Sequence, residues 1–413
     1  MDLKEEISLC QQLRFEQDNK PKVELSSLDE TELKDLLSNL KKEKDSPDEP
    51  NSLEEIISST KFEKIDLDID NYAERIKGAV VARFAGCLLG VPVEGYSIER
   101  MEEIAKMGGT PFPPTEYWHE VDNIKNVQYG VDLRGNYTLN RMDAVLVDDD
   151  ITYTVLNLLL LDKYGVNYKV EDIAQLWLDI LPYACTAEDC ALKELKLGVD
   201  PKNVANNNPY IEWIGAAIRA DAFGYVFAGR PDLAARAAYN DAYLTHRRNG
   251  IYGEMFLAAA IALSFKLHPL EAIKKAIDYI PSNSRLHKDI EWALSYEGKD
   301  INFREARKLI DERFPGMNSV HTNNNMCVIT FVAMMAGDSF TNAVSQCVAI
   351  GLDNDCTAAS IGSMFGAYYT IQGIEDKWYK CFNNKVHTYL KGYENTKLTD
   401  IFELAIKLYK NNL

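Results

Sequence analysis

Residues 351–369 read GLDNDCTAASIGSMFGAYY, and they carry the most information about the fold of this 413-residue chain. A polar turn holds Asp353 and Asp355 and runs directly into a helical pattern. In that pattern Gly362 and Gly366 stand four residues apart among alanines, and small residues at this spacing let two helices approach closely. Two carboxylates in such a turn suit Mg²⁺ or Ca²⁺, although helix capping alone also explains them. The stretch predicts a closely packed helix with an acidic amino end.

A second segment of this kind lies far earlier in the chain. Residues 77–94 read KGAVVARFAGCLLGVPVE, in which glycine and alanine recur along a helical pattern. Pro92 ends that pattern, and Glu94 follows it. The segment predicts another small-residue helix, this time with a carboxylate at its carboxyl end.

A third acidic position precedes the apolar helical run ITYTVLNLLLL. Asp148, Asp149 and Asp150 are consecutive, and one of them is enough to cap that helix. Adjacent carboxylates repel one another and raise each other's pKa unless a cation or several N–H groups compensate. The run is therefore a candidate metal or substrate site as well as a cap.

Long segments with apolar residues at helical spacing recur from Tyr72 onward, and strand-like alternation is scarce. We therefore expect one all-α, compact multi-helix domain over residues 71–413. The composition agrees with a large buried core, since 46% of the residues are hydrophobic.

Residues 1–70 differ in kind, with 20 acidic and 10 basic side chains and no Gly, Trp or Tyr. The stretch KKEKDSPDEP at residues 41–50 predicts a solvated linker, because it has almost no apolar surface to bury. Residues 28–40 have apolar positions near helical spacing, which fits a short helix or a segment that docks a protein partner. We expect an acidic amino-terminal extension that is partly disordered or helical.

The net charge limits the partners of the chain. With 45 basic and 63 acidic residues it is −18, which disfavours nucleic acid and the anionic face of a membrane. Residues 1–6 read MDLKEE without a following apolar run, so no secretory signal is expected. The eight cysteines show no disulfide or zinc spacing. We expect a cytoplasmic protein with reduced thiols.

The three acidic segments, taken in this order, resemble the ADP-ribosylglycohydrolase family. That family carries a GxxxGDxxGxxxE-like helix, then TDDT, then GGDTDT followed by AAxxGxxxGA. This chain has AGCLLGVPVE, VDDDITYT and GLDNDCTAASIGSMFGA at the corresponding places. The resemblance runs from about residue 75 to about residue 372 and leaves the first 70 residues unexplained.

The resemblance implies an all-α glycohydrolase that holds one or two Mg²⁺ ions and releases ADP-ribose from a modified protein side chain or a small ADP-ribosyl compound. It implies Glu94 as the catalytic acid or base. The implied metal ligands are Asp148, Asp149, Asp150, Asp353 and Asp355. Such chemistry is coherent, because Mg²⁺ orients a ribose diol while a carboxylate moves protons.

Several positions depart from the family pattern and define a divergent branch. Cys87 replaces an aspartate of the first segment, and Asp148 replaces the first threonine of TDDT. Cys356 replaces a threonine ligand, and a thiol is a poor partner for a hard cation. Thr357 is the residue that a one-residue shift brings into that place. His246 and the pair Cys356 and Thr357 are further candidates for substrate binding.

Two other readings of the same residues stay open. One is an N-glycosidase of nucleosides or other ribosides on the same fold and metal site. The other is a non-catalytic member, since the family includes crystallins, or a protein that binds a toxin through its acidic extension.

Overall fold

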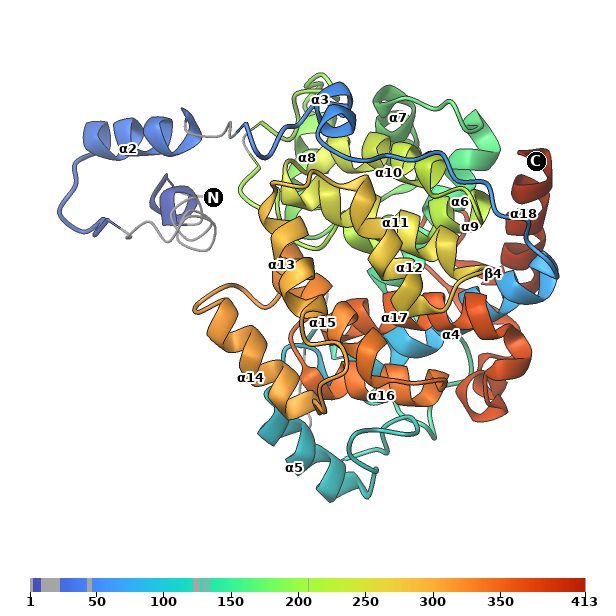
Figure 1. Cartoon of the computed structure of the whole chain (residues 1–413). Coiled ribbons are helices and arrows are strands. Elements are labelled where there is room, and N and C mark those ends of the chain that lie inside the picture. Colours follow the sequence, from blue (N-terminus) through green and yellow to red (C-terminus); the bar gives the residue numbers. More distant parts are fainter. Residues whose placement is uncertain are drawn as a thin grey trace.

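The two small-residue segments form α4 (Tyr72–Gly90) and α17 (Asn354–Tyr369), which pack against each other near the centre of the molecule (Figure 1). The structure is a computed structural model that describes residues 3–8, 23–42, 47–121, 127–128, 131–132, 134–206 and 208–412. In this part of the chain regular structure is nearly all helical, so the prediction of an all-α fold is confirmed.

The helices that surround this central pair follow in chain order. They are α2 (Glu30–Lys42), α3 (Leu53–Ser58), α5 (Ile98–Gly108), α6 (Asp149–Tyr164), α7 (Val170–Ile180), α8 (Thr186–Lys196), α9 (Asp221–Val226), α10 (Pro231–Thr245), α11 (Asn249–Ser264), α12 (Pro269–Ala276), α13 (Arg285–Leu294), α14 (Phe303–Arg313), α15 (Thr322–Met335), α16 (Phe340–Ile350) and α18 (Leu398–Asn411).

Short elements connect them. The 3₁₀ helices are η1 (Val91–Val93), η2 (Arg134–Tyr137), η3 (Ala217–Arg219), η4 (Ile277–Tyr279), η5 (Ile371–Gly373), η6 (Asp376–Trp378) and η7 (Lys380–Phe382). Two antiparallel strand pairs join β1 (Val127–Gln128) to β2 (Val131–Asp132) and β3 (Lys385–His387) to β4 (Asn395–Lys397).

Glycine permits the close approach of α4 and α17. A Cβ atom on Gly78 would lie 2.3 Å from the carbonyl oxygen of Gly366, and one on Gly366 would lie 2.2 Å from that of Gly78. At the other end of the contact, a Cβ on Gly90 would lie 2.3 Å from the Cα of Asp355. The packing that the small residues predicted therefore brings the end of α4 against the acidic turn before α17.

The apolar run around α4 is part of the protein core. Tyr72–Val93 is long and apolar enough to cross a membrane, but 94% of its most apolar window is buried inside the protein. Figure 1 shows α17 and its neighbours in front of it. Burial against other helices accounts for its composition.

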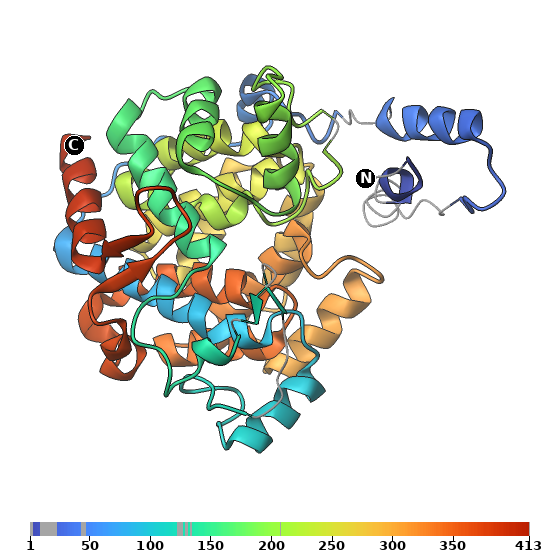
Figure 2. The same ribbon diagram turned by 180° about the vertical axis from the view of Figure 1, so that it is seen from behind.

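The amino-terminal region has two parts. In both views α2 lies apart from the helices of the main body, whereas α3 and the chain after it lie on that body (Figures 1 and 2). Ile56 of α3 is fully buried, and the Leu67 N–H donates to the Gly229 carbonyl at 3.0 Å. The prediction of a solvated linker over residues 41–50 is wrong at Glu49, which is only 6% exposed because it pairs with buried polar groups. Residues 43–46 lie outside the described residues.

Candidate active site

A cavity of about 470 Å³ opens where the acidic turn before α17 meets the end of α4 and the start of α6. We call it the acidic cavity. Its lining residues are Glu94, Asp149, Tyr153, Cys185, Thr186, Glu188, Trp213, Ile214, Gly215, Ile218, Val320, Asp353, Asp355 and Cys356. Three segments that are distant in sequence, those predicted from their carboxylates, thus meet at one place.

Asp148, Asp149 and Asp150 form the amino end of α6. Asp148 is the N-cap, and its Oδ1 accepts from the Asp150 N–H at 3.0 Å. Asp148 and Asp150 are fully buried, whereas Asp149 is half-buried and lines the cavity. The Oδ2 atoms of Asp148 and Asp150 are buried without a hydrogen-bond partner. Capping therefore uses only part of this run, and buried oxygens remain for another ligand.

Arg83 of α4 supplies the cation nearest to this run. Its guanidinium is fully buried and lies 2.8 Å from an Asp150 oxygen and 2.6 Å from an Asp221 oxygen. Burial nevertheless raises the pKa of Asp150 to about 8, with Asp355 adding to the rise and Arg83 opposing it. Burial, Asp149 and Asp355 also raise the pKa of Asp148 well above its usual range. One arginine does not compensate this charge.

The turn before α17 holds the second carboxylate pair. Asp353 is the N-cap residue, and its N–H donates to the Asn325 side-chain oxygen at 3.3 Å. Leu352 precedes it with φ of 66°, in the left-handed region that non-glycine residues rarely occupy. Burial, Asp355 and Glu94 raise the pKa of Asp353 well above its usual range. The chain thus holds two carboxylates together against their mutual repulsion.

Donor atoms from these segments converge in three groups, within each of which the atoms lie no more than 4.8 Å apart. Glu94, Asp353 and Asp355 form one group of oxygen donors, the type that suits Mg²⁺. The other two groups each include a thiol, Cys356 in one and Cys87 in the other. The all-oxygen group fits a hard cation best.

Glu188 is a cavity residue that sequence reasoning missed. It lies in the first turn of α8, and its Oε1 accepts from Arg219 Nη1 at 2.5 Å. Burial raises its pKa to about 7, although Arg219 opposes this rise. A Cβ on the facing Gly215 would lie 2.5 Å from both carboxylate oxygens. The sequence around Glu188 is that of an ordinary amphipathic helix, so no local signal marked it.

The three further candidates for substrate binding take different places. Cys356 lines the cavity, whereas Thr357 is buried in α17 and donates to the Asp353 carbonyl at 2.9 Å. His246 is fully buried, with Nδ1 2.6 Å from the Thr245 hydroxyl, and does not line the cavity. Burial and Arg219 hold the pKa of His246 well below its usual range. The structure thus puts only Cys356 of these three on the cavity surface.

Comparison with known proteins agrees with this architecture. The family model described as ADP-ribosylglycohydrolase matches residues 68–411. A solved structure titled an ADP-ribosylglycohydrolase-related protein complex superimposes with a TM-score of 0.50 at 18% identity, over 83% of this chain and 99% of that one, and shows a shared fold. No curated protein sequence matches. Because the family model spans most of the chain, the protein belongs to the ADP-ribosylglycohydrolase family.

Proposed function

We propose that the chain is a Mg²⁺-dependent hydrolase that cleaves the bond between the anomeric carbon of ADP-ribose and an acceptor, either a protein side chain or a small compound. Membership of the family supports the reaction class. The observation that carries the proposal is the convergence of Glu94, Asp353 and Asp355, with Asp149, on one cavity. This arrangement gathers carboxylates at a ligand-sized space instead of spreading them over a surface.

The carboxylates fit the metal that the family implies. Asp353 and Asp355 of the all-oxygen group would hold it, with Asp149 on the same cavity as a further ligand. Glu94, the third member of that group, would remain within reach of the ion and the substrate. The Oδ2 atoms of Asp148 and Asp150, which have no hydrogen-bond partner, belong to the same acidic region. A bound Mg²⁺ would supply Lewis-acid polarisation and orient a ribose diol. Its charge would also return these carboxylates to their ionised form.

Two glutamates are placed to handle protons. Glu94 follows η1 and lines the cavity beside Asp353, whose ionisation it disfavours. Glu188 lines the same cavity with a pKa of about 7, which suits a group that both gives and takes a proton near neutral pH. Cleavage at a ribose carbon passes through an oxocarbenium-like state that nearby carboxylates stabilise. We assign Glu94 as the acid or base that acts on the scissile bond and Glu188 as a second carboxylate facing the substrate.

The apolar residues that line the cavity fit a nucleobase. Trp213 and Tyr153 offer aromatic rings, and Ile214, Ile218 and Val320 add aliphatic surface. Any nucleobase can stack on such rings. The aromatic lining therefore supports a substrate that contains a nucleoside but does not determine which base it carries.

One observation favours the riboside N-glycosidase as a second candidate. In the described part of the chain, neither lysine nor arginine is among the residues that line the cavity. A diphosphate would therefore depend on bound cations and backbone N–H groups for its neutralisation. A nucleoside carries no phosphate and needs no such neutralisation.

A hydrolysis assay separates the two candidates. The wild-type protein with Mg²⁺ is given ADP-ribosylated arginine, ADP-ribosylated serine and unphosphorylated purine and pyrimidine nucleosides, and the release of free ADP-ribose or free ribose is measured. We expect free ADP-ribose, and its loss in Glu94→Gln with retention in Glu99→Gln, an exposed glutamate of α5. Free ribose from nucleosides alone would transfer the assignment to the N-glycosidase, and no product from any substrate would contradict both.

A further inference from the structure

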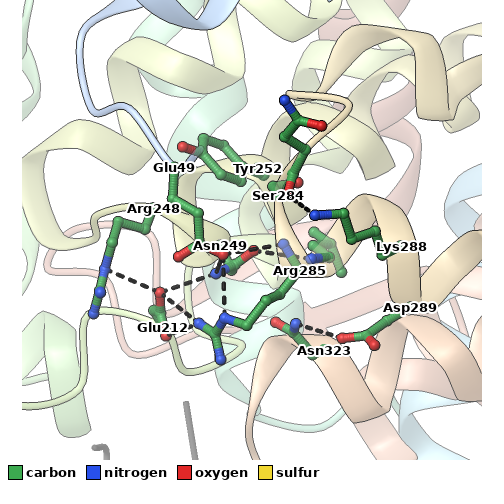
Figure 3. A network of polar contacts seen from close by, with 12 residues as sticks. Glu49, Glu212, Arg248, Asn249, Tyr252, Ser284, Arg285, Lys288, Asp289 and Asn323 are labelled. Atoms are coloured by element: carbon green, nitrogen blue, oxygen red, sulfur yellow. Dashed lines mark hydrogen bonds and ion pairs between the residues drawn. The ribbon is translucent and has the colours of Figure 1, made fainter. Parts of the chain in front are cut away.

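Figure 3 shows a cluster of charged and amide side chains, one of which comes from the amino-terminal region. Its member Glu212 directly precedes Trp213, which lines the acidic cavity. We call this group the rear cluster and define it as Glu49, Glu212, Arg248, Asn249 and Arg285. Glu212 is fully buried, and Glu49, Arg248 and Asn249 are each less than 9% exposed. These side chains therefore depend on one another for their polar contacts.

Glu49 is held by three donors from two helices. Its Oε1 accepts from Asn249 Nδ2 at 2.9 Å, from the Arg285 N–H at 3.0 Å and from Arg285 Nε at 3.1 Å. Figure 3 shows this carboxylate reaching in between Asn249 and Arg285. Charge-assisted hydrogen bonds of this kind are stronger than neutral ones. Glu49 is thus a built-in member of the cluster, although it precedes the part of the chain that the family model matches.

Asn249 and Arg285 also hold Glu212, together with Arg248. Arg285 Nη2 lies 3.0 Å from Glu212 Oε2, and Arg248 Nε lies 3.2 Å from Glu212 Oε1. Asn249 Nδ2 divides its contacts between Glu49 at 2.9 Å and Glu212 at 3.1 Å. Two arginines therefore balance two glutamates. Without Glu49, both arginines would have Glu212 as their partner within the cluster, and the position of Glu212 would change.

A second residue of the amino-terminal region supports an unusual backbone conformation. Arg248 has φ of 51° and ψ of −125°, a combination that costs energy for a non-glycine residue. Its N–H donates to the Asn51 side-chain oxygen at 2.8 Å. Asn51 therefore helps to hold Arg248 where its guanidinium meets Glu212.

Glu212 leads directly into the cavity wall. The next two residues, Trp213 and Ile214, line the cavity, as does Val320. The Thr322 N–H donates to the Glu212 carbonyl at 3.0 Å, and the Ile214 N–H donates to the Val320 carbonyl at 2.9 Å. Backbone hydrogen bonds on both sides of the isolated antiparallel bridge between Trp213 and His321 thus join two segments of the wall, and the rear cluster holds one of them at Glu212.

We propose that Glu49 and Asn51 are positioning residues for the cavity, which set the place of Trp213, Ile214 and Val320 through Arg285, Arg248 and Glu212. The role of the wall in binding substrate rests on the proposed function. The positioning itself does not, because it concerns backbone contacts that are measurable without substrate.

Hydrogen exchange of the full-length chain tests the positioning. We compare the wild type with Glu49→Ala and Asn51→Ala, and follow the Ile214 and Thr322 amides. Both amides should exchange about tenfold faster in each variant, because exchange reports local opening of the wall. The Leu67 amide, which bonds to Gly229, serves as an internal reference and should keep its wild-type rate. Glu54→Ala removes an exposed glutamate from the same region and should change none of these rates.

ADP-ribose titrated in the presence of Mg²⁺ tests the consequence for the site. The Kd should rise about tenfold in Glu49→Ala and less in Glu49→Gln, which keeps an oxygen acceptor, since small displacements of a binding wall weaken binding strongly. Glu54→Ala should bind as the wild type does.

Three outcomes would be decisive. Unchanged exchange at Ile214 and Thr322 in both alanine variants would overturn the proposal, even if their melting temperatures fell, because Glu49 and Asn51 would then only fasten the amino-terminal region. Faster exchange with unchanged ADP-ribose affinity would overturn the link between the wall and the ligand. If the wild type fails to bind ADP-ribose while the exchange result holds, the proposed function fails and the positioning stands. Asn51→Ala, which keeps Glu49, provides the test if Glu49→Ala does not fold.

Discussion

The acidic cavity and the rear cluster are both rich in carboxylates, but only in the rear cluster do the arginines equal the glutamates in number. In and around the cavity, Arg83 and Arg219 face a larger number of carboxylates. Arg248 and Arg285 hold the pKa of Glu212 well below its usual range, even though burial opposes this. In the cavity, burial and neighbouring carboxylates raise the pKa of Asp148 and Asp353 well above theirs. A buried carboxylate with cationic partners, such as Glu212, stabilises the fold. A buried carboxylate whose charge is not balanced, such as Asp148 or Asp353, is suited to bind a cation.

The largest expected effect comes from removing an arginine of the rear cluster. Arg285→Met removes the partner of both Glu49 and Glu212 and leaves buried carboxylates short of a cation. We expect the free energy of unfolding to fall by about 3 kcal/mol, the lower range for breaking a buried ion pair. Urea denaturation followed by circular dichroism measures it. Arg304→Met, which breaks an exposed pair with Glu102, should cost less than about 1 kcal/mol, and an equal cost for both variants would contradict the distinction.

The next largest effect comes from removing a carboxylate of the acidic cavity. Asp353→Asn and Asp149→Ala each remove a carboxylate from the cavity, and Mg²⁺-dependent affinity for ADP-ribose should fall at least about 100-fold, as expected for the loss of a charged ligand of a metal. Neither variant should lower the stability of the metal-free protein, because each removes a repulsive charge. The exposed Asp300→Asn is the matched control. Calorimetry and thermal melts give the two quantities, and wild-type affinity in both variants would exclude this cavity as the metal site.

The pH dependence of stability should differ between the two regions. Asp150 rises from its ordinary value of 3.8 to about 8, so the folded state binds more protons than the unfolded state between these values. Its contribution to stability is complete below pH 3.8 and is lost as the pH rises to about 8. Asp150 alone should therefore lower the free energy of unfolding of the metal-free protein by about 2 kcal/mol between about pH 5.5 and about pH 7.5. Asp150→Asn should remove this share of the slope and leave the share that comes from the raised pKa values of Asp148, Asp353 and Glu188.

Glu212 provides the contrast, because its pKa is lowered. Its contribution is present above the ordinary value of about 4.5 and is lost only as the pH falls through the lower folded value. Glu212→Gln should thus lower the free energy of unfolding equally at about pH 5.5 and about pH 7.5. A slope that is undiminished in Asp150→Asn but disappears in Glu212→Gln would reverse the roles given to the two regions.

The smallest expected effect tests whether Cys356 faces the metal ion. Cys356 places a thiol within 4.8 Å of donor oxygens of Asp150 and Asp355. Because a hydroxyl is a harder ligand than a thiol, Cys356→Thr should raise Mg²⁺ affinity about threefold and lower the preference for Zn²⁺ over Mg²⁺. Cys327→Ser, at a buried cysteine outside the cavity lining, is the control. Competition titrations of the two ions measure the change, and unaltered selectivity would show that Cys356 does not face the ion.

The sequence predicted those parts of the site that have a local signature. Asp149 and Asp353 stand next to helix starts in acidic runs, and the glycines of α4 and α17 recur at a spacing that needs a close neighbour. Each of these signals arises because the residue type departs from what a helix or a core requires at that place. The family resemblance then joined the separate runs into one site.

The remaining parts have no such signature. Glu188 sits in an amphipathic helix, and only its approach to Gly215 and Arg219 gives it a role. Glu49 lies in a charged, proline-containing stretch of the type that usually stays in water. Its burial depends on donors from α11 and α13, far away in sequence, which no local pattern reveals.

The most direct test of the central claim is calorimetric titration of ADP-ribose into the wild-type protein, first metal-free and then loaded with Mg²⁺. The account predicts measurable binding with Mg²⁺ and little or none without it, because the carboxylates of the acidic cavity need a cation before they accept an anionic ligand. Equal binding in both states, or no binding in either while the protein remains folded, would contradict the claim that these carboxylates assemble a metal-dependent ADP-ribose site.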